Sequence, residues 1–425
     1  MSKAPILGAV LTIAMALGSP AVGRTGANPA NTGARPSCTV RILFLGNSYT
    51  YFNDLPAVVS ELAKAGGQCA VETRMIAPGG AQLKDHWGAA ETHATLRAEK
   101  WDYVVLQDQS SLGVGYYLDG NPRVASDALF LPYARKWAKE IRQLGAQPVF
   151  YLTWSRKATP DDQAALNYAY IHAAKETGGL VAPVGIAWRQ VRERNPALEL
   201  YYKDGTHPSP GGTYLAACAI YATIFRRDPS GLPPHIVGVP VNLETEKPEP
   251  DKTAVLIDLP ASDAAILQRA AWRSWTAQTR SDHRSLRPVS PPKPIVAPGQ
   301  PLSPASLDGT WRGQLLFYPG VGPVEVVLKL QRADTAWRGR LDIDYPPNTF
   351  AAESFDLGDL QVGQREITFS DPKSAGVNNW RIDFRGSLNG SELKGIATTV
   401  SERKDEPPIV VLGDWSLRRD GVAHP

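Results

Sequence analysis

The sequence predicts an α/β protein: a three-layer domain with a parallel sheet between helices, followed by a smaller antiparallel β domain. Residues 40–226 alternate short apolar segments with longer segments of helical periodicity, the pattern of a parallel sheet covered by helices on both faces. Beyond residue 306 the apolar period changes to two, as in antiparallel strands with one buried face. A proline-rich stretch, residues 281–306, is predicted as a stiff linker between the two patterns.

Length and composition limit the possible functions. The chain has 425 residues, more than one hydrophobic core normally holds, so two or three domains are expected. Its 45 basic and 42 acidic residues nearly balance, and no run of like charges stands out. We therefore expect neither nucleic acid nor an anionic membrane surface as a partner.

The N-terminus predicts export. Lys3 precedes an apolar segment, residues 5–17, and small residues follow, so residues 1–23 are interpreted as a removable signal peptide. The apolar segment is too short to span a bilayer, which predicts a periplasmic or extracellular protein without a membrane span once the signal is removed. An uncleaved membrane anchor is the alternative. Residues 24–37, rich in Gly, Pro, Asn and Ala, are predicted as a flexible lead-in.

The first domain, residues 38–280, is predicted to contain five strands. They are residues 40–45, 70–76, 103–106, 148–153 and 180–183. Helical periodicity predicts helices at residues 55–66, 81–99, 126–144, 161–177, 211–225 and 261–279, the last packing back on this domain. Ligands bind beyond the carboxyl ends of the strands in such sheets. Both Gly46-Asn47-Ser48 and Gln107-Asp108-Gln109 lie at strand carboxyl ends.

The second domain, residues 307–420, is predicted as an antiparallel β-barrel or sandwich. Its strand candidates are residues 310–315, 324–330, 337–343, 366–369, 380–384 and 393–398. It opens on Gly309-Thr310-Trp311 and closes on Gly413-Asp414-Trp415, which loosely resembles small lipocalin-like barrels.

Two of the three cysteines are expected to form a disulfide. Cys38 precedes the first predicted strand and Cys69 the second. If these strands are parallel neighbours, their starts lie within the few ångströms that a disulfide spans. Cys218 is then free and buried. Two unpaired thiols are the alternative.

Three residues in two segments suggest nucleophilic acyl transfer. Ser48 follows a buried strand in the turn before a helix, where backbone N–H groups favour developing negative charge. Asp204 and His207 share a tight turn, so the carboxylate can orient the imidazole as a general base. Taken singly, Ser48 can be a helix cap, and Asp204 can form an Asx-turn beside an incidental histidine. Their combination in this order predicts a Ser–His–Asp triad.

These segments resemble the SGNH/GDSL hydrolase superfamily over residues 40–226. Gly46-Asn47-Ser48 matches the nucleophile block, with Asn47 where many members have Asp, and Asp204-Gly205-Thr206-His207 matches the Asp-x-x-His block. The Gly-x-Ser-x-Gly elbow of α/β-hydrolases is absent. The resemblance implies a flavodoxin-like α/β/α fold and serine esterase activity without a cofactor. It also implies that the N–H groups of Ser48 and Gly80, or of Gly79 beside it, bind the oxyanion.

The chain departs from the family at the third strand. Members usually supply an oxyanion-binding Asn there, whereas this chain has Gln107-Asp108-Gln109-Ser110. A Gln carries the same amide donor on a longer arm, so Gln109, or else Gln107, is the predicted substitute. Losing such a donor costs on the order of 10²–10³ in rate.

Aromatic residues near these segments are candidates for contact with substrate. Tyr49 and Trp154 are predicted to wall the site, where they suit a sugar ring or an acyl chain, although each is individually more typical of a core. No histidine or cysteine spacing typical of a metal site is present, so no metal is expected.

The sequence thus predicts an exported serine esterase that cleaves a small acyl ester. The resemblance, together with export, implies an O-acetyl group on a carbohydrate as the substrate. A lipase or thioesterase would use the same triad, and a polysaccharide O-acetyltransferase would share its covalent intermediate. In a different class, the protein is a catalytically weak binding protein that uses its β domain.

Overall fold

The computed structural model describes residues 38–421, apart from residues 114, 119–120, 281–295, 297, 317–322, 335, 346–350, 372–380 and 404–405. The predicted signal peptide and lead-in, and most of the predicted linker, lie outside the described residues. No helix in the described part of the chain is both long and apolar enough to cross a membrane.

A five-stranded parallel sheet forms the centre of the first domain. Its strands are β1 (Thr39–Leu45), β2 (Ala70–Ile76), β3 (Tyr103–Leu106), β6 (Gln147–Tyr151) and β7 (Leu180–Ala182). They follow the order β2-β1-β3-β6-β7, with every neighbouring pair parallel. This is the strand order of flavodoxin-like sheets, so the predicted fold class is confirmed.

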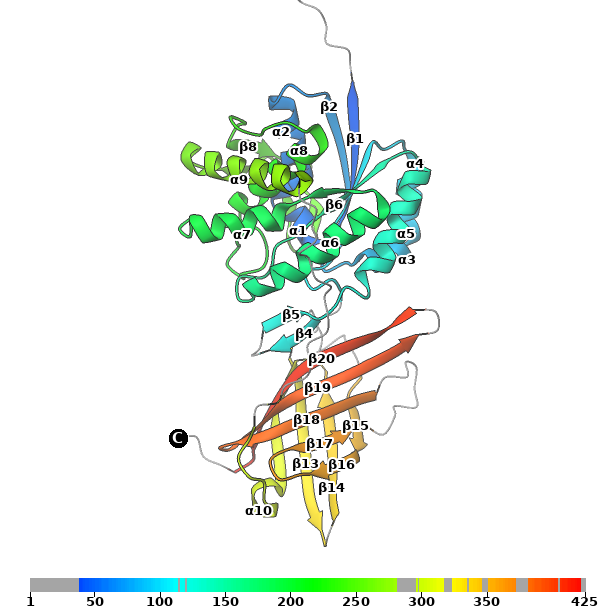
Figure 1. Ribbon diagram of the computed structural model, residues 1–425, viewed down its shortest axis with the longest axis vertical. Coiled ribbons are helices and arrows are strands. Elements are labelled where there is room, and N and C mark those ends of the chain that lie inside the picture. Colours follow the sequence, from blue (N-terminus) through cyan, green and yellow to red (C-terminus); the bar gives the residue numbers. More distant parts are fainter. Residues whose placement is uncertain are drawn as a thin grey trace, which may run out of the picture. The chain divides into compact units, whose positions relative to one another are not determined.

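Helices cover both faces of this sheet (Figure 1). They are α1 (Ser48–Tyr51), α2 (Leu55–Ala65), α3 (Leu83–Gly88), α4 (Ala90–Ala98), α5 (Phe130–Gln143), α6 (Gln163–Thr177), α7 (Val184–Arg194), α8 (Pro210–Phe225) and α9 (Ala261–Arg280), with single 3₁₀ turns at Phe52–Asp54 and Pro160–Asp162. The helix predicted over residues 81–99 is two helices, because Ala89 adopts an extended conformation between them. Helix α7 was not predicted from the sequence.

Strand β1 shows why its apolar run is continuous. Ile42 and Phe44 pack into a core shared with α2, α7, α8 and α9, whereas Leu43 and Leu45 pack into a core shared with α3, α5 and α6. Successive side chains of a strand point to opposite faces, so a strand buried on both faces needs apolar residues throughout. Helix α8 is likewise apolar around its circumference because it contacts both α2 and α9.

Three short strand pairs lie in segments of residues 38–280 whose sequence shows little periodicity, and one strand of the first pair, β4, also pairs with β20 (Glu406–Arg419) of the second domain. Antiparallel pairs join β4 (Gly115–Leu118) to β5 (Asn121–Val124), β8 (His235–Gly238) to β11 (Ala254–Asp258), and β9 (Val241–Asn242) to β10 (Lys247–Pro248). Leu243 and Glu246 lie in the turn between β9 and β10.

The β domain follows a short helix, α10 (Pro304–Leu307). Its strands are β12 (Gly309–Leu316), β13 (Val324–Ala333), β14 (Ala336–Asp344), β15 (Glu353–Asp356), β16 (Gly358–Val362), β17 (Ile367–Ser370), β18 (Arg381–Asn389), β19 (Glu392–Arg403) and β20 (Glu406–Arg419). They pair antiparallel in the order β15-β14-β13-β12-β20-β19-β18-β17-β16, and β14 also contacts β16. The sheet is therefore a nearly closed barrel. Trp311, Phe369, Phe384 and Trp415 help to fill its interior.

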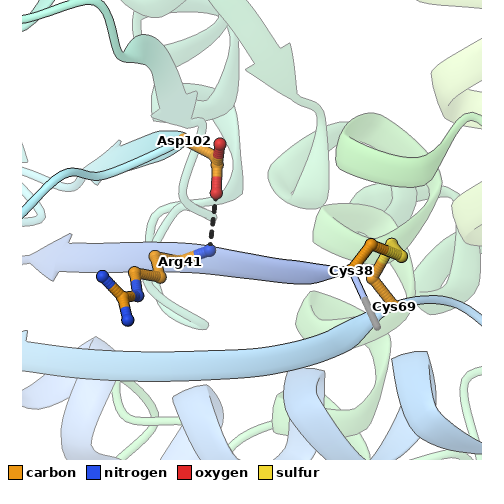
Figure 2. The surroundings of a disulfide bond; sticks show 4 residues. All are labelled: Cys38, Arg41, Cys69 and Asp102. Carbon is orange, nitrogen blue, oxygen red and sulfur yellow. Dashed lines mark hydrogen bonds between the residues drawn. A yellow bond between two sulfur atoms is a disulfide. The ribbon is translucent and has the colours of Figure 1, made fainter. Parts of the chain in front are cut away.

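The predicted disulfide is present. Cys38 and Cys69 are bonded, with their Cα atoms 5.0 Å apart, and Cys218 is a buried free cysteine. Figure 2 shows the bond at the N-terminal ends of the adjacent strands β1 and β2. In the same region the backbone N–H of Arg41 donates to Asp102 Oδ2 at 2.8 Å, which ties β1 to the start of β3.

Candidate active site

The nucleophile segment leaves β1 at its carboxyl end. Asn47 is extended and caps α1, its side-chain oxygen accepting from the N–H of Tyr49 at 3.1 Å, so Ser48 is the first residue of this helix. Gly46 packs so closely against Thr50 and Gln107 that a β-carbon there would collide with both side chains. Glycine at position 46 thus allows the close packing of this turn, and the cap by Asn47 starts the helix at the half-buried Ser48.

Buried side chains hydrogen-bond to the turn that carries Ser48 and fix its conformation. Gln107, with no exposed surface, accepts from the N–H of Asn47 at 2.9 Å and from the Thr50 hydroxyl at 3.0 Å. Its amide nitrogen donates to Asn47 Oδ1 at 2.9 Å and to the carbonyl of Asp108. His86 Nε2 donates to the carbonyl of Gly46 at 2.8 Å, and burial lowers the pKa of this imidazole, which favours its neutral form.

The second segment is a tight turn before α8. Asp204 Oδ1 accepts from the N–H groups of Thr206 and His207 at 2.9 and 3.0 Å, and Asp204 Oδ2 lies 2.5 Å from His207 Nδ1. Burial tends to raise the pKa of Asp204, but these hydrogen bonds together outweigh it and lower the pKa below its ordinary value. Asp204 is thus an ionised carboxylate that orients the ring.

The two segments meet at Ser48 and His207. Nε2 of His207 lies 2.8 Å from Oγ of Ser48. The tautomer that satisfies both neighbours carries its proton on Nδ1, donates it to Asp204, and accepts from the serine hydroxyl at Nε2. The structure therefore brings the three predicted residues into one chain of hydrogen bonds, the arrangement in which a base removes the proton of a nucleophile.

Aromatic rings fix the position of the histidine. Phe52 stacks on the imidazole of His207, with ring centroids 4.3 Å apart and an angle of 9° between the planes. Tyr49 meets the same ring edge-on and donates to or accepts from the hydroxyl of Thr206 at 2.6 Å. Phe52 was missed from the sequence, where nothing distinguishes it from a core residue.

The prediction for Trp154 is wrong. Its side chain is fully buried, stacked between Tyr49 and Trp188, and its indole N–H donates to the carbonyl of Thr206 at 2.9 Å. Trp154 therefore supports the Asp204–His207 turn from behind and offers no surface to a substrate. Tyr49 is also nearly buried but does line the pocket in front of Ser48.

The two candidate glutamines differ in what their amides already bind. Both donors and the acceptor of Gln107 are already used, by Asn47 and Thr50 of the nucleophile turn and by the carbonyl of Asp108, so the structure contradicts Gln107 as an oxyanion donor. Gln109 lines the pocket; its oxygen accepts from Ser111, and its amide nitrogen makes no hydrogen bond to the described residues. Gln109 therefore stays the candidate donor.

The candidate backbone donors also differ in whether their N–H groups are already hydrogen-bonded. The N–H of Gly79 donates to Glu246 Oε2 at 2.8 Å, whereas the N–H groups of Gly80 and Ser48 have no acceptor among the described residues. Gly80 lines the pocket with a positive φ of 70°, a conformation that favours glycine. Of the two glycines, Gly80 is the one left able to bind a ligand oxygen.

A pocket of about 490 Å³ opens in front of Ser48 and His207. Its wall combines apolar side chains with a few polar groups, namely Asn47, Tyr49, Tyr51, Phe52, Gly79, Gly80, Gln109, Ser110, Arg156, Asp204, Thr206 and Leu243. Arg156 and Leu243 were not predicted. Arg156 follows the end of β6 and was detectable by that placement, whereas Leu243 lies in an unpatterned turn that gives no signal. Within the described residues no cluster of three metal-ligating side chains occurs.

No family model matches this chain, and no curated protein matches it. Among solved structures, a protein from Slackia heliotrinireducens assigned to the SGNH hydrolases is 32% identical, with 44% of this chain covering 100% of that one and a TM-score of 0.38. The chain belongs to the SGNH hydrolases. The identity over the whole of that relative decides this, and as a member the protein is a serine ester hydrolase.

More distant structures are also similar to parts of this SGNH hydrolase. A DUF4886 family protein from Bacteroides uniformis is 17% identical, with 59% of this chain covering 100% of that one and a TM-score of 0.42. An acetyl-xylooligosaccharide esterase from Geobacillus is 18% identical, with 43% of this chain covering 92% of that one and a TM-score of 0.35.

Proposed function

We propose that this SGNH hydrolase is an exported esterase that removes a small acyl group, acetyl in particular, from a hydroxyl of a carbohydrate. The observation that carries the proposal is the hydrogen-bonded chain from Ser48 through His207 to Asp204, open to a pocket with unused N–H donors. The Cys38–Cys69 disulfide supports export, because such bonds persist in oxidising compartments.

In the proposed reaction, Ser48 Oγ attacks the ester carbonyl carbon as His207 Nε2 takes the hydroxyl proton. The oxyanion that forms accepts from the N–H groups of Ser48 and Gly80 and from the amide of Gln109. Its collapse breaks the bond to the alcohol oxygen, which leaves with the proton from His207. Water then attacks the acyl–serine ester with the same base, releases the carboxylic acid and restores Ser48.

The test of this mechanism is covalent labelling. A fluorophosphonate should phosphonylate Ser48, identified by peptide mass spectrometry, and the adduct should be absent in both Ser48→Ala and His207→Ala. Near-ultraviolet circular dichroism confirms that each variant is folded. A folded wild-type protein that takes no label, or takes it at another serine, contradicts the assigned nucleophile.

Substrate size and export are tested separately. On 4-nitrophenyl esters, kcat/KM should be highest for acetate and fall as the acyl chain lengthens, since a preference for octanoate would favour a lipase. Acetate release from acetylated sugars then tests the carbohydrate part. Expression of the full chain in a bacterial host should give a periplasmic or secreted product whose first residue lies close to residue 24.

A further inference from the structure

The wall of the pocket in front of Ser48 includes one positively charged side chain, that of Arg156. Arg156 lies beyond the carboxyl end of β6, is partly buried, and lines the same pocket as Ser48 and His207. Its Nη2 donates to the Ser110 hydroxyl at 2.9 Å, which fixes the guanidinium in the pocket wall. Because the guanidinium has five N–H groups, this bond leaves most of its donors for a ligand.

Arg156 has no acidic partner in the described part of the chain. No carboxylate oxygen of the described residues lies within ion-pair distance of it, and Ser110 is neutral. Its sequence neighbour is different: Lys157 lies outside the pocket lining and forms an ion pair with Glu199 at 2.5 Å. The charge of Lys157 is thus balanced by protein, whereas the charge of Arg156 is not.

The acidic side chain in the pocket lining already has hydrogen-bond donors of the protein on both of its oxygens. Asp204 is the sole carboxylate in the pocket lining, and its two oxygens accept from the N–H groups of Thr206 and His207 and from the His207 ring. Arg156 is therefore the charged side chain of the pocket lining whose hydrogen-bonding groups are largely unused, and so the one able to bind an anionic group. A concave, partly desolvated wall strengthens the attraction between such a cation and an anion.

The cation also lies close to the reaction centre. Arg156 is near enough to Tyr49, the residue after Ser48, to oppose the rise that burial causes in the pKa of that phenol. A group bound to Arg156 thus lies beside Tyr49, which adjoins Ser48. One small substrate can therefore contact both Arg156 and the nucleophile.

We propose that Arg156 binds an anionic group on the alcohol part of the substrate, so that the preferred substrates are acylated acidic sugars. This inference rests on the proposed esterase function. A planar guanidinium forms two parallel hydrogen bonds with a carboxylate or a phosphate, which makes Arg156 a residue that determines specificity. Uronic acids and sugar phosphates share this chemistry.

The test compares matched substrates. Acetate release is measured for the acetylated methyl glucuronoside, its neutral methyl ester, and the acetylated methyl glucoside 6-phosphate. The wild type should favour a charged substrate over the neutral ester in kcat/KM. In Arg156→Gln that preference should fall by about 10-fold to 100-fold, as expected for loss of a charge-assisted bidentate pair. The phosphate and carboxylate arms distinguish the two kinds of acidic sugar.

Two further variants control the result. Arg156→Lys keeps the charge but removes the planar group that forms two parallel hydrogen bonds, so it should retain part of the preference for the charged substrate. Lys157→Gln removes an equal charge one residue away, outside the pocket, and should leave the preference at its wild-type value. Equal loss on charged and neutral substrates in Arg156→Gln, or a preference that does not change, would overturn the proposal.

A binding measurement separates this inference from the proposed function. Calorimetry with methyl glucuronoside and Ser48→Ala requires no chemistry, and adding Arg156→Gln to that variant should abolish binding. If no ester is hydrolysed but this pattern holds, the esterase proposal fails and the anion site stands. If acetyl esters are hydrolysed and the charged preference is insensitive to Arg156, the anion site fails alone.

Discussion

The two segments that form the triad are held in opposite ways. The nucleophile turn rests on a buried network in which Gln107 and Asn47 exchange hydrogen bonds and His86 binds Gly46. The turn that carries the base is at the surface, where the side chains of His207 and Asp204 are 25% and 37% exposed. It is fixed by local N–H bonds to Asp204 and by stacked rings. The nucleophile is thus positioned by the core, and the base by its own turn.

This difference predicts which substitutions lower activity and which lower the stability of the fold. A residue on the exposed side can be removed with little effect on folding, because water replaces its partners. A residue of the buried network leaves unsatisfied polar groups in the core when it is removed. Each experiment below tests that separation.

The largest effect is expected from the triad itself. His207→Ala and Ser48→Ala should lower kcat by about 10⁴ to 10⁶, because residues of a triad act as a unit. Since both side chains retain contact with water, the free energy of unfolding should change by less than about 1 kcal/mol. Ester hydrolysis and urea unfolding provide the two readouts. A strongly destabilised His207→Ala would show that the exposed turn is also structural.

Gln107 belongs to the buried network and Gln109 lines the pocket, so the same substitution at each compares the two groups of residues. Gln109→Leu should lower kcat by about 10²–10³ through loss of an oxyanion donor. Gln107→Leu should instead destabilise the protein by about 2–4 kcal/mol, since it leaves the N–H of Asn47 and the Thr50 hydroxyl without their acceptor. A Gln109 variant with unchanged kcat on acetate esters would remove Gln109 from the oxyanion site.

The two aspartates at the site should respond to pH in opposite directions. Burial raises the pKa of Asp108 to about 7, while Asp204 has a lowered pKa. A raised pKa in the folded state means that Asp108 favours folding most below its unfolded pKa, and that this contribution is lost as pH rises towards 7. The contribution of Asp204 is instead present above the unfolded pKa and lost as pH falls through the folded one.

Asp108→Asn isolates the first of these effects. The stability of the wild type relative to this variant should fall between about pH 4 and pH 7, by at most ~4 kcal/mol at roughly 1.4 kcal/mol per pKa unit. Guanidinium unfolding at half-unit pH intervals measures it. A difference between the two proteins that stays constant with pH, or that grows as pH rises, would show that folding does not raise the pKa of Asp108.

The smallest effect is expected where an aromatic ring supports the base. Phe52→Leu keeps an apolar side chain but removes the stacked ring, and should lower kcat by about 3-fold to 10-fold. Phe369→Leu is the control, since Phe369 also stacks on a ring, that of Phe384, but does so inside the β domain. It should reduce stability and leave kcat unchanged. Equal losses of kcat in both variants would point to a general packing effect.

Much of the fold was predictable because apolar periodicity is a local property. Strands β2 and β3 begin and end at the predicted residues, and β1, β6 and β7 differ by two residues or fewer. The two-residue period of the β domain also predicted β12, β13, β14, β17, β18 and β19, whereas β15, β16 and β20 were not predicted. Helix α7 was missed, and the helix over residues 81–99 was not seen to break at Ala89, because both depend on how neighbouring elements pack.

The sequence by itself determined the residue types of the site, since Ser48, Asp204 and His207 lie in short segments whose spacing has chemical meaning. The tertiary structure decided the roles of residues that look alike in sequence. Gln107 and Gln109 carry the same amide two positions apart. The amide of Gln107 is hydrogen-bonded to the nucleophile turn, whereas Gln109 lines the pocket. Trp154 and Arg156 follow the same strand, yet the indole is buried and the guanidinium lines the pocket. Burial and partners come from segments distant in the chain, which no local pattern encodes.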